Sequence, residues 1–236
     1  MKFGEQEQIP GHAIEEEVLG ETKIEAREKK IEEGDYFDIE HHFEAVKEFQ
    51  PFKDPANPVE KPFPCQVKKE IATILGVRDE QLRYYTSAGY PPLDYHRDRK
   101  IDSFIELDSG GGDCARVTWD ITTKPEDLTG DKIADVIILW EKDGIDPKLD
   151  EDKDKWNDKI NKTAEDSIKI LQRTVADKGG VIRPLTEFEI EESRRMHSEN
   201  IKAQSVKLEK AEGENDIPRM RLLERQLRHQ KRKKAS

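Results

Sequence analysis

The segment IDSFIELDSGGGDCARVTWDIT, residues 101–122, decides the fold of this chain. Residues 115–122 alternate apolar and polar side chains with the period of two that is typical of strands, and IDSFIEL before them is also typical of a strand. The glycine-rich stretch DSGGGDC separates the two halves. The segment therefore predicts an antiparallel hairpin with strands at about 101–107 and 115–122, and a five-residue loop would pair Asp108 with Cys114.

The same register sets Asp102 opposite Asp120, and both side chains then lie on one face, because side chains alternate between faces along a strand. Opposite residues have Cβ atoms about 4.5–5.5 Å apart, and like charges there destabilise the sheet. Two carboxylates so placed favour a cation, and Mg²⁺ is typically held by one or two carboxylates together with waters and phosphate oxygens. The alternative is that this face is open to solvent, where the repulsion is tolerated.

Two amphipathic helices and two further strands are predicted around the hairpin. One helix, at about 66–76, ends near Gly76, and the other spans about 152–177. The run IADVIILW is nearly all apolar, so we expect a strand at 134–140 that is buried on both faces and covered by these helices. VIRPL, at 181–185, predicts a short last strand. The fold class is α/β, with a mixed sheet in an αβββαβ-like core.

An amphipathic helix bearing Glu70, followed by IDSFIEL with Asp102 and VTWDIT with Asp120, resembles the core of the PD-(D/E)XK nuclease-like superfamily over residues 65–185. The signature of that core is an Asp on one strand and an acidic-x-Lys triplet on the next, often assisted by a Glu from the first helix. The resemblance implies that Asp102, Asp120 and Glu70 hold Mg²⁺ or Mn²⁺. It also implies hydrolysis of phosphodiester bonds in DNA or RNA.

The chain departs from this pattern at the lysine. Thr122 stands where the triplet has Lys, so Lys124 or Lys132 would supply the catalytic amine from a displaced position. The departure favours a second hypothesis, an inactive nuclease-like module that binds nucleic acid or assembles with a protein partner. A third hypothesis is an unrelated α+β interaction protein whose hairpin only mimics the signature. The facing aspartates favour the enzyme.

The segments on either side of the core are more polar. We divide the chain into an acidic N-terminal arm (1–60), the core (61–186) and a polar helical extension with a basic tail (187–236). Apolar residues in 13–34 are too sparse for a core-facing stripe, which predicts a weakly docked or disordered arm. Five prolines in residues 51–64 set the boundary to the core, because proline interrupts helices. Both arms are candidate surfaces for a protein partner.

The C-terminal tail carries eight basic residues and one acidic residue between 219 and 236, although the whole chain has a formal net charge of −11. Such an asymmetry is typical of chains that contact polyanions. We predict that the tail binds nucleic acid through Arg225, Arg228, Lys231, Arg232, Lys233 and Lys234. The alternatives are a solubility tail and a segment folded against the acidic body.

Other site classes find little support. The acidic and histidine-rich run DIEHHFE, 38–44, is expected to be solvated or partner-facing. The loop-like run DYHRDRK, 94–100, could place His96 and Arg97 near the hairpin. No run reaches the ~20 apolar residues of a membrane span. The N-terminus MKFGEQEQIP has no apolar centre of a signal peptide. Two cysteines 49 positions apart make a zinc knuckle or disulfide scaffold unexpected. We therefore expect a cytoplasmic protein without a membrane segment.

Overall fold

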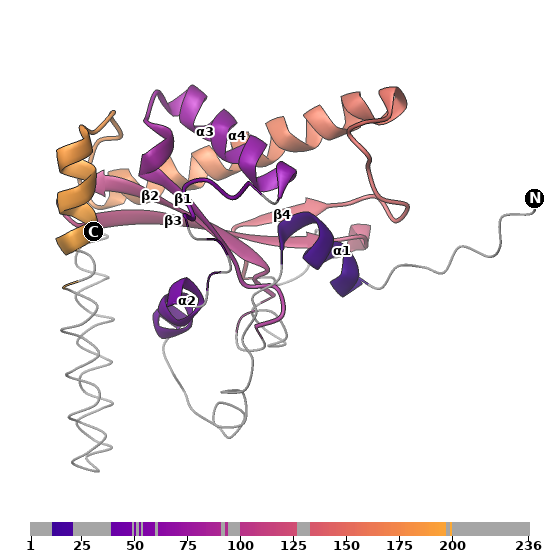
Figure 1. Ribbon diagram of the computed structural model, residues 1–236, viewed down its shortest axis with the longest axis horizontal. Helices are drawn as coiled ribbons and strands as arrows, with labels where there is room; N and C mark the ends of the chain where they lie inside the picture. Colours follow the sequence, from indigo (N-terminus) through magenta and orange to yellow (C-terminus); the bar gives the residue numbers. More distant parts are fainter. Residues whose placement is uncertain are drawn as a thin grey trace, which may run out of the picture.

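The computed structural model describes residues 11–20, 39–48, 50, 52, 54–59, 61–90, 93, 100–126, 133–196 and 199. The strands form one four-stranded mixed sheet in the order β1-β2-β3-β4 (Figure 1). These strands are β1 (Leu82–Thr86), β2 (Ser103–Gly110), β3 (Asp113–Thr122) and β4 (Val136–Leu139). The first three are antiparallel neighbours, and β3 pairs with β4 in parallel.

The predicted hairpin is confirmed, including the pairing of Asp108 with Cys114. The predicted five-residue loop is shorter in the structure, because β2 runs on to Gly110 and β3 begins at Asp113. Gly111 and Gly112 form the turn with φ of 66° and 80°. Two positive φ angles in a two-residue turn match the right-handed twist of the strands, and glycine adopts them without a steric penalty.

Two long helices cover one face of this sheet. The first, α3 (Pro62–Leu75), begins with a proline, whose missing N–H costs nothing at a helix start, and is capped by Gly76 at φ 64°. The second, α4 (Lys153–Asp177), packs beside α3 over the same face (Figure 1). Their apolar stripes join Ile105, Val117 and Trp119 in the main hydrophobic cluster.

That arrangement corrects the prediction that the two helices cover both faces of the strand at 134–140. β4 is an edge strand in the order of the sheet, and it is buried on one side only because both helices lie on one face. Val136 and Ile138 are buried, whereas Ile137 and Leu139 are partly exposed.

The predicted class, helices with one mixed sheet, is confirmed, but the order of elements differs from the predicted αβββαβ. The predicted strand at 181–185 is absent, since residues 181–186 form no strand. The sheet has β1 instead, at the edge next to β2. The side chain of Gln81 replaces a strand partner for residues 181–186. It donates to the backbone carbonyl of Arg183 at 3.1 Å and accepts from the backbone N–H of Leu185 at 2.8 Å. A buried amide can satisfy a backbone segment that has no ladder.

The N-terminal helix α1 (Gly11–Leu19) is part of the fold rather than a weakly docked arm. Its side chains Ile14, Val18 and Leu19 are buried in the main cluster. Tyr84 donates from its hydroxyl to the Leu19 carbonyl at 2.7 Å. The Lys61 ammonium donates to the backbone carbonyls of residues 16 and 17 in the last turn of α1. Docking therefore satisfies the last carbonyls of a short helix, which have no partners within it.

The opposite face of the sheet is covered by α2 (Ile39–Glu48). Phe43 and Val46 of this helix pack on Tyr85 and Phe104 in a second, smaller cluster. Phe43 and Phe104 meet edge to face with ring centroids 4.8 Å apart. The expectation that residues 38–44 are solvated is wrong for α2, since His42 and Phe43 are buried. In the described part of the chain, no helix has the length and apolar character needed to cross a bilayer.

We predict that Gln81→Ala destabilises the protein by about 3 kcal/mol, because the buried backbone groups of residues 108 and 185 and the partly buried carbonyl of residue 183 lose their partner. Urea unfolding measures the change. Gln172→Ala, at an exposed position of α4, is the matched control and should change stability by less than about 0.5 kcal/mol. Equal effects of the two substitutions would contradict the role given to Gln81.

Candidate functional site

Asp102 lies immediately before β2 and is almost completely buried, with 1% of its surface exposed. The β2–β3 ladder ends at the pair Ser103 and Trp119. Beyond that pair, a carboxylate oxygen of Asp102 accepts the backbone N–H of Ile121 at 2.6 Å. The carboxylate thus takes the place of a missing backbone carbonyl at the end of the ladder.

Asp120 is the residue just before that N–H, and only 3% of its surface is exposed. The Asp102 carboxylate is therefore bonded to the peptide unit that joins Asp120 to Ile121. Since β3 alternates, Asp120 shares its face with Thr118 and Thr122, opposite to the apolar face of Trp119. The alternative of a solvent-exposed face does not hold, because both aspartates are buried.

A short loop after β1 fixes the backbone of Asp102. The N–H groups of Ser87 and Ala88 donate to the Asp102 carbonyl at 2.7 and 2.9 Å. The Asp102 N–H donates to the Trp119 carbonyl at 2.9 Å. Both backbone groups of Asp102 are thus bonded, and the side chain starts from a rigid position.

The remaining predicted site residues are distributed unevenly. Thr122 is buried, and its hydroxyl accepts the backbone N–H of Lys124 at 3.2 Å. The side chain of Lys124 is exposed, two residues after the end of β3. Glu70 is on α3, which covers the face opposite to Asp120, so the structure does not bring Glu70 to the aspartates. The described residues contain no group of three His, Cys, Asp or Glu side chains that could hold a metal ion.

Several predicted residues lie outside the described part of the chain. These are His96, Arg97, Lys132, Arg225, Arg228, Lys231, Arg232, Lys233 and Lys234. Their roles stay predictions.

A second aspartate caps β3 from its other side. Asp135, just before β4, accepts the backbone N–H and the hydroxyl of Thr118 at 2.9 Å each. Both neighbours of β3 are therefore preceded by an Asp whose carboxylate bonds to β3. No sequence pattern identified Asp135, because its partner Thr118 lies 17 positions away in the chain.

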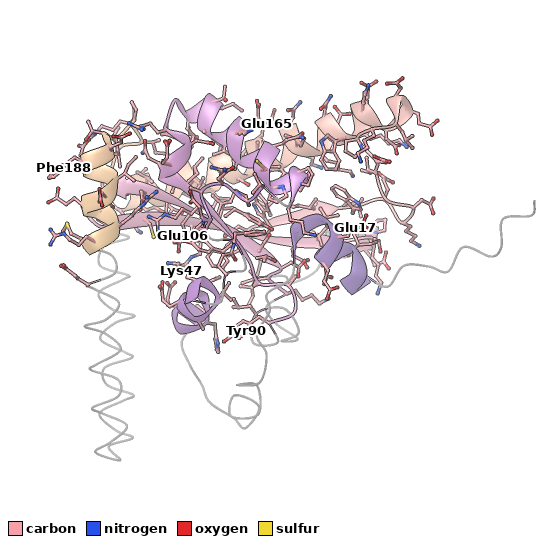
Figure 2. The ribbon with its side chains drawn as sticks, viewed as in Figure 1. Glu17, Lys47, Tyr90, Glu106, Glu165 and Phe188 are labelled. Atoms are coloured by element: carbon pink, nitrogen blue, oxygen red, sulfur yellow. The ribbon has the colours of Figure 1, made fainter. Side chains whose placement is uncertain are left out.

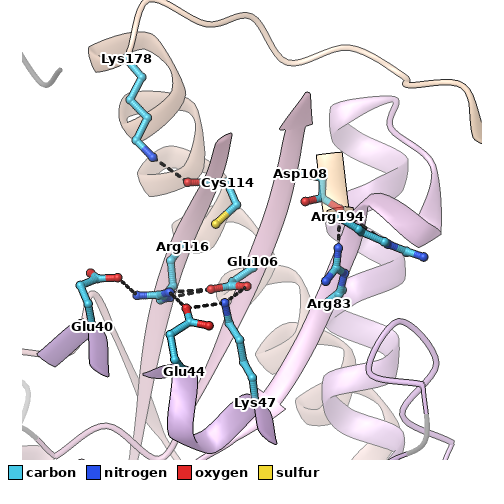
Figure 3. A network of polar contacts seen from close by, with 10 residues as sticks. All are labelled: Glu40, Glu44, Lys47, Arg83, Glu106, Asp108, Cys114, Arg116, Lys178 and Arg194. Atoms are coloured by element: carbon cyan, nitrogen blue, oxygen red, sulfur yellow. Dashed lines mark hydrogen bonds and ion pairs between the residues drawn. The ribbon is translucent and has the colours of Figure 1, made fainter. Parts of the chain in front are cut away.

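A buried network of charges, which sequence analysis missed, holds α2 on the sheet (Figure 3). Glu106 on β2 bonds to Arg116 on β3 at 2.6 Å and to Lys47 on α2 at 2.9 Å. Arg116 also pairs with Glu40 at 3.0 Å, and Lys47 pairs with Glu44 at 2.8 Å. In the sequence, this network is indicated only by the opposite charges of Glu106 and Arg116, which the hairpin register pairs across the two strands.

The charges in this network are mutually stabilised. Burial by itself would raise the pKa of Glu106, but Arg116 and Lys47 outweigh it and lower that pKa to about 2. Burial likewise opposes the charge of Lys47, yet Glu106 and Glu44 raise the pKa of the amine. The Arg116 guanidinium also lies 3.9 Å from the centre of the Phe43 ring, a cation–π contact. Arg116 therefore contacts α2 both through ion pairs and through the ring of Phe43.

Cys114 lies beside this network. Burial of its thiol raises the pKa to about 12, and the negative charge of Glu106 adds to the effect. A thiol with so high a pKa stays protonated at neutral pH, and the thiolate is the nucleophile. The raised pKa therefore does not favour a nucleophilic role for Cys114.

Comparison of this chain with protein-family models, curated proteins and solved structures found no match.

We predict that Glu106→Gln lowers the free energy of unfolding by about 3 kcal/mol at neutral pH, because Lys47 and Arg116 lose the carboxylate that compensates their buried charges. The carboxylate pKa is lowered on folding, so its contribution is complete above its unfolded pKa of about 4.3 and is lost as pH falls toward 2. The stabilities of wild type and variant should therefore converge in acid.

Chemical denaturation between neutral pH and pH ~2 measures both curves. Glu165→Gln, on the outer side of α4, removes an exposed carboxylate as the control (Figure 2). Parallel curves for wild type and Glu106→Gln would contradict the lowered pKa.

Proposed function

We propose that this protein is a metal-dependent nuclease of the PD-(D/E)XK type that hydrolyses phosphodiester bonds through Asp102 and Asp120. One observation carries the proposal. Two buried carboxylates lie at one end of the β2–β3 hairpin, and one of them is bonded at 2.6 Å to the peptide unit beside the other. Strand β3 holds Asp120, and the bonded backbone next to β2 holds Asp102, as a site that must keep its geometry requires.

The donor set fits a hard divalent cation. Mg²⁺ and Mn²⁺ favour carboxylate and water oxygens, and Mg²⁺ needs only one or two protein carboxylates. An ionised carboxylate has two oxygens with about four acceptor positions, so Asp102 can bond to Ile121 and to a cation together. Asp102 and Asp120 would hold the ion, and we leave Glu70 out of the ligand set.

When bound, the cation would polarise the scissile phosphate and lower the pKa of a coordinated water. The protein residues have separate tasks. Asp102 and Asp120 fix the ion relative to the sheet. Lys124, exposed after Thr122, would stabilise negative charge that develops on the phosphate, and Lys132 remains a second candidate for that role.

The second candidate function is an inactive module of the same kind that binds nucleic acid or a protein partner. The hydrogen bond from Ile121 to Asp102 favours it, because this bond gives the carboxylate a structural role that needs no metal. Thr122 at the position of the signature lysine favours it as well.

We predict that Asp102→Asn and Asp120→Asn each weaken Mn²⁺ binding about tenfold or more, a loss of ~1.4 kcal/mol. Asparagine in place of Asp102 keeps a carbonyl oxygen for the Ile121 N–H, so the loss reflects the missing charge. Asp102→Ala should also destabilise the fold by about 1–3 kcal/mol, since the Ile121 N–H is left without an acceptor. Isothermal titration measures binding, and thermal unfolding measures stability.

Asp113→Asn, which removes an exposed carboxylate at the hairpin turn, is the control and should leave Mn²⁺ binding unchanged. Unchanged binding in both site variants would refute the metal site. Binding of Mn²⁺ without cleavage of DNA or RNA would select the inactive module.

We also predict that deleting residues 219–236 weakens nucleic-acid binding and reduces its dependence on salt. For every phosphate that the truncated chain no longer neutralises, the slope of log affinity against log salt should become shallower by about 0.7–0.9. Fluorescence anisotropy at several salt concentrations, with intact and truncated chains, measures the slope. Equal slopes would show that the tail does not bind phosphates.

A further inference from the structure

Lys100 has an unusual backbone conformation next to the candidate site. Its φ is 43°, and no other non-glycine residue in the described ranges has a positive φ. The left-handed region is sterically unfavourable for a side chain with a Cβ, and glycine adopts it freely. Strained residues of this kind gather at functional sites, where the surrounding structure holds them.

The hydrogen bonds after Lys100 explain how the strain is maintained. The Ile101 N–H donates to the Leu93 carbonyl at 3.0 Å, and the Ile101 carbonyl accepts the Ser87 hydroxyl at 2.7 Å. The N–H and carbonyl of Asp102 are bonded as well. Ile101 and Asp102 are each 1% exposed, whereas Lys100 is exposed. The chain therefore turns from solvent into the core within one residue, with the following backbone fixed.

The Lys100 side chain is available to a ligand. Within the described ranges it makes no hydrogen bond or ion pair, whereas Glu106, Arg116 and Asp108 on the sheet are paired. Its Cα is two positions along the chain from that of Asp102, which limits the distance between them to about 7 Å. Its flexible stem thus starts at the edge of the buried carboxylates.

We infer that Lys100 binds a phosphate of the nucleic-acid backbone beside Asp102 and Asp120. This inference rests on the proposed function and adds a substrate contact to it. A chain with a formal net charge of −11 repels a phosphate, and a lysine at the edge of the site would add to the attraction that the bound cation and Lys124 provide. A lysine ammonium binds phosphate as a point charge. Glycine would be the better residue if the position served only the turn.

Three substitutions at Lys100 separate the turn from the charge. Lys100→Gly removes both the strain and the ammonium, Lys100→Gln removes the charge and keeps a long side chain, and Lys100→Arg keeps the charge. Lys69→Ala removes an exposed lysine on α3 and is the control for net charge. The probes are short fluorescent DNA duplexes and single strands of DNA and RNA, and the readouts are affinity, its salt dependence and thermal stability.

We expect Lys100→Gly to be as stable as wild type or more stable, and to bind the probe about tenfold more weakly, with a salt slope lower by about 0.7–0.9. Lys100→Gln should lose the same affinity, whereas Lys100→Arg and Lys69→Ala should bind as wild type does. The nucleic acid that shows the larger loss identifies the substrate.

The inference is overturned if the wild-type chain binds no probe. It is also overturned if Lys100→Gly and Lys100→Gln bind the probe as tightly as Lys69→Ala does. A less stable Lys100→Gly chain would overturn it too, since the strain would then be absent. Mn²⁺ titration separates the two proposals. Lys100→Gln should bind Mn²⁺ as wild type does, so a loss of affinity for the probe in this variant reports on the lysine alone. If Asp120→Asn binds Mn²⁺ as tightly as wild type, the metal site is refuted instead.

Discussion

The hydrogen bond from the Ile121 backbone to the Asp102 carboxylate organises the end of the sheet on which the proposed site depends. The central strand β3 extends beyond the end of its partner β2, and Asp102, just before β2, supplies the acceptor that the ladder lacks. The same solution recurs on the other side, where Asp135 bonds to Thr118. A single side-chain type thus ends both ladders of β3 without leaving a buried N–H unsatisfied, which would cost about 1–3 kcal/mol.

The two faces of the sheet are covered by different interactions. On one face, α3 and α4 bury a continuous apolar cluster that includes Trp119 and Ile105. On the other face, α2 combines a small aromatic cluster with the network of Glu106, Arg116 and Lys47. Charged groups in such a network depend on one another, because each loses its compensation when a partner is removed. The helix α2 is therefore held by a specific geometry rather than by apolar area alone.

The proposed site lies where these features meet. Asp120 on β3 and Asp102, whose backbone is bonded to a loop, are both buried, and Lys100 with its positive φ precedes Asp102 by two positions. Burial strengthens electrostatic interactions, which makes the site suited either to a cation or to a structural role for Asp102. The charge of the carboxylates distinguishes these roles. A structural cap needs only an oxygen acceptor, whereas a metal ligand needs the negative charge.

The sequence by itself determined the hairpin and its pairing of Asp108 with Cys114, the helix ending at Gly76 and the long amphipathic helix α4. These features follow from the periods of two and 3.6 residues and from glycine at a turn or cap, all of which are local. It also predicted Asp102 and Asp120 on neighbouring strands, and the structure has Asp120 on β3 but Asp102 just before β2. Tertiary structure alone decided the packing of α3 and α4 on one face, the replacement of a strand at 181–185 by hydrogen bonds with Gln81, and the burial of α1 and α2. It also decided the positive φ of Lys100. Each of these depends on interactions between residues far apart in the chain, and the local pattern of a segment does not say which distant groups will satisfy its backbone or cover its side chains.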